Sequence, residues 1–267
     1  MEQMKKRFFA YVDRFYSEND AHNRAIRLKR DHTRRVCRNA QMLANKLYLS
    51  DTDGRLIEIM ALFHDIGRFK QYWVYKTFRD VDSENHARLS VSEIKAYSLL
   101  TGLAETDRTL VCQAIEFHNA FAIPDHLSSR LQFFLRLLRD ADKLDIWKVF
   151  GEYCEDPQRS ATDSVALGLP DTAQYSQGAL NAVCAGRLVR TGDLKTLNDF
   201  KLLQVSWVYD INFVPTMAAM LDKGYMDRLR TYLPDTREIH EAFEMVFGYA
   251  AAVVEAGAAA KIGRKNR

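Results

Sequence analysis

The sequence predicts an all-α fold. Apolar residues recur at helical spacing along most of the 267 residues, and no series of short alternating strands interrupts them. The chain contains only 12 glycines and 5 prolines, so few positions favour a break in a helix. A hydrophobic content of 47% is ordinary for a globular protein and is sufficient for a substantial core. We therefore expect helices joined by short turns.

The first helix that carries a candidate metal ligand is expected to begin near Asp31, which could cap it. His32 shares a stripe at helical spacing with Val36 and Ala40, which places this imidazole at the N-terminal end of a buried face. A buried histidine can also be a core residue bonded to a backbone carbonyl. His32 alone therefore does not define a site.

The most informative segment is the doublet His64-Asp65, which ends an apolar helical run and precedes Gly67. Burying an imidazole and a carboxylate costs several kcal/mol unless they are paired or coordinated. Adjacent residues of a helix point about 100° apart, so the doublet could give two ligands to one ion or share a carboxylate between two ions. The alternative is a capping aspartate beside a core histidine.

Two further histidines lie at helix ends. His86 opens a helix behind residues 82–85, on a face of mixed polarity, and His118 continues the apolar face of the helix 107–117. Each is an expected inward-facing residue. Each could also be a core histidine without a ligand role.

The last candidate helix carries an apolar stripe from Leu131 to Leu138. A four-residue step continues this stripe onto Asp142 and then to Asp145, whereas Asp140 points elsewhere. Helical phase therefore nominates Asp142 for the core and Asp145 as its partner one turn on. We expect Asp140 to be solvated.

Taken together, these residues resemble the HD-domain superfamily of metal-dependent phosphohydrolases, whose minimal pattern is H, HD, D. His32, the doublet and Asp142 match this order over about residues 20–150. His86 and His118 resemble the extended form of members with two metals, which include HD-GYP phosphodiesterases and di-iron relatives that cleave dinucleoside polyphosphates. A GYP motif does not follow the doublet, so the resemblance does not extend to cyclic di-GMP as substrate.

The resemblance implies a helical HD bundle with a metal centre. Its expected ligands are His32, His64, Asp65, His86, His118 and Asp142. With two ions, Asp65 would span both. With one ion, His86 and His118 would instead act as acids or phosphate contacts. Imidazole and carboxylate ligands suit Mn, Fe, Zn, Ni or Co and do not choose among them.

The expected activity is that of a divalent-metal-dependent phosphohydrolase or phosphodiesterase. Its substrate would be a small phosphorylated metabolite, by expectation a nucleotide, attacked by a metal-bound hydroxide. We expect Asp65, Arg68 and Lys143 to be the catalytic residues, with the two cations gripping phosphate. Both cations could equally be surface residues near helix ends. Two other functions stay open: a di-iron HD-type oxygenase and an inactive nucleotide-binding sensor.

The expected organisation is an HD domain over residues 1–155 and a helical extension over residues 156–267 that packs on it. The net charge of +3 does not favour a nucleic acid polymer as partner, and the four cysteines contain no CxxC pair. The N-terminus shows no secretory signal, and the apolar segment 242–254 is shorter than a membrane span. We expect a cytoplasmic protein without a membrane partner, and the oligomeric state stays open.

Overall fold

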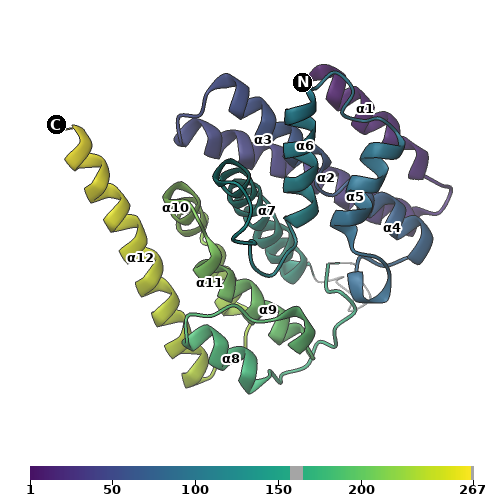
Figure 1. The fold of residues 1–267 in the computed structure, drawn as a ribbon. Coiled ribbons are helices and arrows are strands. Elements are labelled where there is room, and N and C mark those ends of the chain that lie inside the picture. The colour runs from purple at the N-terminus through teal and green to yellow at the C-terminus, as the bar shows by residue number, and fades with distance from the viewer. Residues whose placement is uncertain (157–164, 266–267) are drawn as a thin grey trace. The chain divides into compact units, whose positions relative to one another are not determined.

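The computed structural model describes residues 1–156 and 165–265. Within these ranges every regular element is a helix and none is a strand (Figure 1), which confirms the predicted all-α fold. The chain divides into two compact units, Met1–Asp145 and Ile146–Arg267. The division falls inside one long helix, Ser129–Glu155.

The first unit contains all the predicted ligands. Its helices are α1 (Glu2–Val12), α2 (Asp20–Lys46), α3 (Asp51–Phe63), α4 (Gly67–Tyr75), α5 (His86–Ala96), α6 (Glu105–Phe117) and the first part of α7 (Ser129–Glu155), with the 3-10 turns η1 (Asp13–Phe15) and η2 (Asp80–Asp82). α3 packs on α2, α6 and α1, and α5 packs on α4 and α6. Phe8 of α1 lies fully buried with its ring 6.2 Å from that of Phe63 and 6.0 Å from that of Phe69. This aromatic cluster fixes the elements on either side of the doublet.

α2 begins earlier than the sequence suggested. The side chain of Asn19 caps the helix by accepting a hydrogen bond of 2.9 Å from the backbone N–H of His22. Asp31 therefore lies inside α2 and does not cap it, so that prediction was wrong. Local spacing misplaced the start because Asn19 offers a capping oxygen a full three turns before the predicted start. His32 consequently sits within a continuous helix, which fixes its direction more firmly than a helix end would.

The joint between α3 and α4 carries the doublet. Ser50 caps α3, and His64 and Ile66, on either side of Asp65, keep helical torsion angles (φ −56°, ψ −40° and φ −60°, ψ −29°). At Gly67 a Cβ atom would lie 2.5 Å from the backbone nitrogen of Ser90 and 2.8 Å from the carbonyl oxygen of His86. Only glycine permits this approach of α4 to α5, which brings His86 beside the doublet.

The second unit is also helical. It holds the end of α7 followed by α8 (Gln177–Cys184), α9 (Leu197–Ser206), α10 (Val214–Asp222), α11 (Tyr225–Thr231) and α12 (Arg237–Lys265), with the 3-10 turns η3 (Thr191–Asp193) and η4 (Trp207–Asp210). Trp147 is buried and its indole N–H donates to the carbonyl of Gln204 at 3.1 Å. Residues 157–164 of the predicted extension lie outside the described ranges. The packing of this extension on the HD domain stays a prediction.

Helix α12 (Arg237–Lys265) contains the apolar segment 242–254. Within the described residues, Arg237–Ala259 is the one stretch long and apolar enough to cross a membrane by length and composition, and 22% of its most apolar window is buried. The segment 242–254 is thus part of a longer helix that extends beyond it at both ends. Core helices of soluble proteins pass the same test, so the finding is weak evidence for a membrane.

Candidate metal centre

The structure brings all six predicted ligands together inside the first unit. They come from α2 (His32), the joint between α3 and α4 (His64 and Asp65), the first residue of α5 (His86), the end of α6 (His118) and α7 (Asp142). The four imidazoles and Asp65 are at most 6% exposed, with His64 fully buried. Hydrophobic packing does not explain such a concentration of polar groups in a core.

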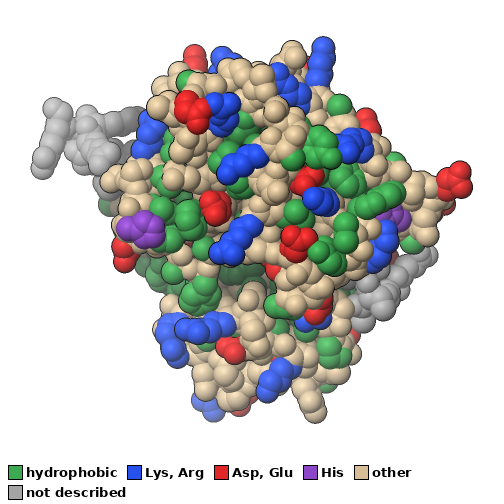
Figure 2. Space-filling model, turned by 45° about the vertical axis from the view of Figure 1, so that its right-hand side comes forward, with side chains coloured by type: hydrophobic (Ala, Val, Ile, Leu, Met, Phe, Trp, Pro, Cys, Tyr) green, Lys and Arg blue, Asp and Glu red, His purple; other side chains and the backbone are tan. Residues whose placement is uncertain are grey.

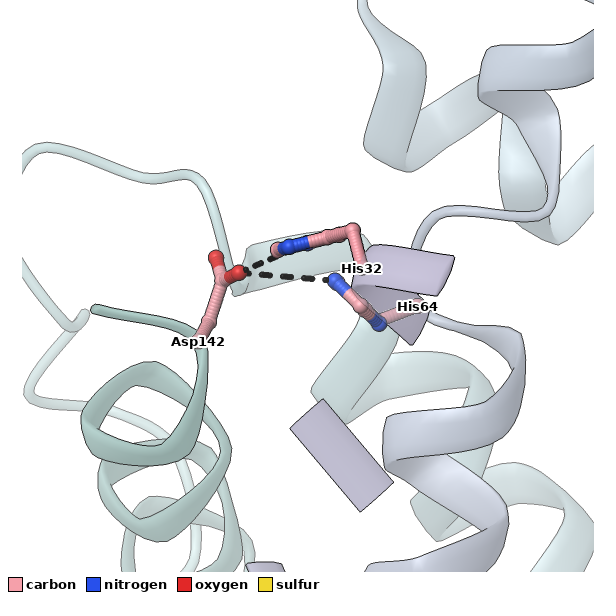
Figure 3. Close-up of side chains that lie close together, drawn as sticks. All are labelled: His32, His64 and Asp142. Atoms are coloured by element: carbon pink, nitrogen blue, oxygen red, sulfur yellow. Dashed lines mark ion pairs between the residues drawn. The ribbon is translucent and has the colours of Figure 1, made fainter. Parts of the chain in front are cut away.

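We term one set of these atoms the first donor group. It consists of the side chains of His32, His64 and Asp142 together with Oδ2 of Asp65. Asp142 Oδ1 lies 3.1 Å from His32 Nε2 and 3.6 Å from His64 Nε2, and all three side chains point toward one another (Figure 3). Asp65 Oδ2 lies 3.6 Å from His32 Nε2 and 3.7 Å from His64 Nε2. The group therefore presents two nitrogens and two oxygens to a common centre.

The second donor group lies on the other oxygen of the same carboxylate. His86 Nε2 is 3.1 Å from His118 Nε2. Asp65 Oδ1 lies 3.6 Å from the first of these nitrogens and 3.9 Å from the second. Asp65 thus turns one oxygen toward each group.

The donor atoms fit a metal ion. Two ligands bound at about 2.1 Å to one ion lie about 3.0 to 3.4 Å apart, close to the separations found here. Two buried atoms of the first donor group, His64 Nε2 and Asp142 Oδ1, make no hydrogen bond of acceptable geometry. Unpaired buried polar atoms are costly, and a cation between them would satisfy both.

In each of the four imidazoles of the site, Nδ1 points away from the donor groups and forms a hydrogen bond. Nδ1 of His64 donates to the carbonyl of Ala61 at 2.8 Å, and Nδ1 of His118 donates to the carbonyl of Ile115 at 2.6 Å. Because a carbonyl oxygen only accepts, these bonds place the proton of a neutral ring on Nδ1 and leave a lone pair on Nε2. Both rings therefore offer Nε2 to the site in the form that a metal requires.

The anchors of the other two imidazoles are carboxylates. Nδ1 of His32 lies 2.7 Å from Asp145 Oδ2, and Arg35 holds the same carboxylate through bonds of 2.6 and 3.1 Å. Nδ1 of His86 lies 2.7 Å from Asp80 Oδ2. A carboxylate behind a ligating histidine fixes its ring and strengthens the donor nitrogen.

Asp140 does not behave as predicted. Its side chain is fully buried, as are the neighbouring Ala141 and Leu144. The prediction of a solvated Asp140 was wrong because this part of α7 is enclosed nearly all round, so helical phase no longer separates an inner from an outer face.

The predicted cations are distributed unevenly around the site. Arg68 Nε lies 3.5 Å from Asp65 Oδ1, while the two hydrogens on NH1 of the same guanidinium are shared among Gln71, the carbonyl of Phe78 and Asp80. Lys143 is buried next to Asp142 in α7. Lys29, which the sequence analysis did not select, donates to Asp65 Oδ2 at 2.8 Å.

The electrostatics of the site favour charged carboxylates. Burial raises the pKa of Asp65. The nearby Lys29, His64 and Arg68 lower it by a larger amount, so the pKa lies well below its usual range. Burial lowers the pKa of His118 to about 3, aided by repulsion from His86. Burial also lowers the pKa of His86, aided by Arg68. The second donor group is therefore deprotonated near neutral pH.

His32 is the exception among the imidazoles. Burial and Lys29 lower its pKa, but the nearby carboxylates of Asp142 and Asp145 outweigh them and raise it to about 9. In the metal-free protein a proton on Nε2 can therefore stand between these groups in place of a cation.

Three residues of the site escaped the sequence analysis: Lys29, Asp80 and Asn119. Lys29 lies three positions before His32 on the same helix, so helical spacing could have found it. Asp80 belongs to the turn between α4 and α5, and Asn119 follows α6. No periodic pattern places a turn residue against a histidine of another element, so only the fold could identify these two.

The comparison with known families agrees with this geometry. Residues 30–147 match the family model of the HD domain. No curated protein and no solved structure matches the chain. The matched range includes all six predicted ligands, and its His and Asp groups could hold a metal ion. Residues 30–147 therefore form an HD domain.

Proposed function

We propose that this protein is a divalent-metal-dependent phosphohydrolase or phosphodiesterase that acts on a small phosphorylated metabolite, with nucleotides as the expected class. The observation that carries the proposal is the position of Asp65. Its two oxygens face two different pairs of imidazoles, with Oδ2 toward His32 and His64 and Oδ1 toward His86 and His118. This arrangement suits a pair of ions bridged by one carboxylate.

Each protein group has a defined task in this proposal. The first donor group would hold one ion and the second donor group the other. Bound ions of this kind lower the pKa of a shared water and neutralise charge on a phosphate. His64 and His118 keep their protons on Nδ1 through backbone carbonyls, so Nε2 stays available as a ligand. Asp65 stays ionised over the whole neutral range because its pKa is well below the usual value.

The charges around the ligands favour an anionic substrate. Lys29 and Arg68 both form ion pairs with Asp65. Their side chains are 18% and 14% exposed, so each cation is near the site and partly open to solvent. We propose that they, together with Lys143, contact phosphate oxygens. Lys29 makes one charged contact in the site, whereas Arg68 also binds the turn at Asp80.

A small substrate suits the surface charge. Acidic and basic side chains are interspersed on the face drawn in Figure 2, and the net charge of the chain is +3. A polymer of nucleic acid is bound through an extended basic surface. We therefore propose a small phosphorylated molecule as the partner, and a cytoplasmic location, where such metabolites occur.

The oxygenase alternative has a specific basis in the ligand set. Four imidazoles and two carboxylates also suit a pair of iron ions. The cations on Asp65 favour phosphate over an uncharged substrate. An inactive sensor would share the site and would bind a nucleotide without turnover.

One experiment separates these three functions. The protein is purified, its metal content is measured, and it is screened against phosphomonoesters, phosphodiesters and nucleotides with Mn²⁺, Co²⁺ or Fe²⁺, with and without oxygen. A phosphohydrolase releases phosphate or a phosphomonoester without oxygen. Oxygen consumption that depends on iron would establish the oxygenase, and tight nucleotide binding without turnover in any metal would establish the sensor. Absence of bound metal under all conditions would contradict the proposal.

A further inference from the structure

The four imidazoles of the site are anchored in two different ways. His64 and His118 bond to carbonyls three residues earlier in their own chain segments, so their anchors are set once those segments form. His86 instead bonds through Nδ1 to Asp80 Oδ2 at 2.7 Å, and Asp80 lies outside α5 in the turn η2. The direction of the His86 ring therefore depends on the placement of a turn.

The Asp80 carboxylate forms hydrogen bonds with residues of three other segments: α4, the start of α5 and the residues just after α6. NH1 of Arg68 and Nε2 of Gln71, both on α4, each donate to Oδ1 at 3.0 Å. Nδ2 of Asn119, just after α6, donates to Oδ2 at 3.2 Å. With the bond to His86 at the start of α5, this single carboxylate links the ends of three helices.

The turn around Asp80 is itself fixed. Gln71 is fully buried, and its Nε2 also lies 2.8 Å from Ser83 Oγ and 2.9 Å from the carbonyl oxygen of Glu84, so its two hydrogens are shared among three acceptors. NH1 of Arg68 donates to the carbonyl of Phe78 at 2.5 Å. These bonds hold the backbone on both sides of Asp80, so its carboxylate has a defined position behind His86.

We propose that Asp80 is a positioning residue for a second metal ion bound by the second donor group. It would fix the ring of His86 and strengthen Nε2 as a donor, as carboxylates behind ligating histidines do. The first donor group has its own anchor, because His32 is held by Asp145. Loss of the Asp80 carboxylate is therefore expected to weaken the binding of the ion held by the second donor group and to leave the binding of the other ion unchanged. This inference rests on the two-ion form of the proposed function.

The test counts metal ions in the full chain. Metal-free protein is titrated with Mn²⁺, and free Mn²⁺ is followed by electron paramagnetic resonance, for the wild type and for Asp80→Ala and Asp80→Asn. We expect two ions in the wild type. In Asp80→Ala the affinity for one ion falls about 10-fold to 100-fold, the usual effect of removing such a carboxylate, while the other is unchanged. Asp80→Asn, which keeps an oxygen acceptor for His86, recovers part of the loss.

Two matched variants make the result specific. Asp145→Asn removes the charge behind His32 and is expected to weaken the other ion. Asp82→Asn changes an aspartate of the same turn whose side chain is 49% exposed and paired with Arg79, and it is expected to leave both ions unchanged. Circular dichroism establishes that each variant keeps its helical content.

Each outcome decides the inference separately from the proposed function. Two wild-type ions, with one selectively weakened in Asp80→Ala, support it. Unchanged binding of both ions in Asp80→Ala overturns it and leaves the hydrolase proposal intact, as does equal loss of both ions in a folded variant. A wild type that binds one ion also overturns it, since no second ion exists for Asp80 to serve. A wild type that binds none contradicts the proposed function itself.

Discussion

The ammonium group of Lys29 lies 2.8 Å from Oδ2 of Asp65. Burial alone would raise the pKa of this carboxyl, and Lys29 is the largest of the influences that lower it. The Lys29 side chain also lies over the ring of Phe78, with Nζ 5.3 Å from the ring centroid. A cation thus contacts the carboxylate that faces both donor groups, close to where a phosphate would bind under the proposed function.

Replacement of Lys29 is expected to separate substrate binding from metal binding. In Lys29→Ala, metal affinity is retained or increased because a positive charge beside the site is removed. The ratio kcat/KM for an anionic substrate falls about 10-fold to 100-fold, as expected for one lost hydrogen bond to a charged group. Arg34→Ala, which changes an exposed arginine of the same helix, is the control. Loss of bound metal in Lys29→Ala would show that the lysine supports the ligands instead.

The doublet provides the most direct test of the metal centre. His64→Ala and Asp65→Ala are each expected to remove metal and activity while far-UV circular dichroism stays close to that of the wild type. His22→Ala is the matched control, because His22 is also buried in the first unit but bonds to the carbonyl of Phe15 away from the ligands. Metal analysis of the three variants gives the answer. Wild-type metal content in both doublet variants would exclude the site.

Gly67 is expected to be intolerant of any side chain. A Cβ atom there would lie 2.5 Å from the backbone of Ser90, so Gly67→Ala forces α4 and α5 apart. We expect a loss of about 1 to 3 kcal/mol in the free energy of unfolding, together with weaker metal binding through the displacement of His86. Gly178→Ala on α8 meets no atom within 4 Å and is the control, with stability unchanged or slightly increased. Urea unfolding compares the two, and equal stabilities would contradict the packing argument.

Metal affinity is expected to rise with pH. In the metal-free protein the pKa of His32 is raised to about 9 from an ordinary value of 6.5. The protonated ring therefore stabilises the metal-free fold fully below about pH 6.5, and this contribution is lost as the pH rises through about 9. A metal must displace the same proton, so its affinity increases across this window by up to about tenfold per pH unit.

Proton release on metal binding checks this prediction. Calorimetric titration at pH 7.5 in buffers of different ionisation enthalpy counts the protons, and about one per first ion is expected. In Asp145→Asn the pKa of His32 falls because a hydrogen-bonding carboxylate is lost, so fewer protons are released. A pH-independent affinity between pH 7 and 9 would show that His32 is not a ligand.

The sequence by itself determined the all-α fold and nominated six candidate metal ligands. Helical spacing placed His32, His118 and Asp142 on the inward side of their helices because each continues an apolar stripe, and a buried face excludes polar groups that have no partner. The doublet was informative for the same reason. Helical spacing gave a wrong prediction for Asp140. There α7 is enclosed on nearly all sides, so the spacing of apolar residues does not distinguish a buried face from an exposed one.

The tertiary structure alone decided how these residues meet. The assignment of one Asp65 oxygen to each donor group depends on distances between residues far apart in the chain. Asp80 came to light only in the fold, because a turn between helices has no repeat from which its position could be calculated. Local sequence sets which face of a helix is buried, whereas the contacts between faces depend on helix packing, which is fixed here by the close approach of Gly67 to α5.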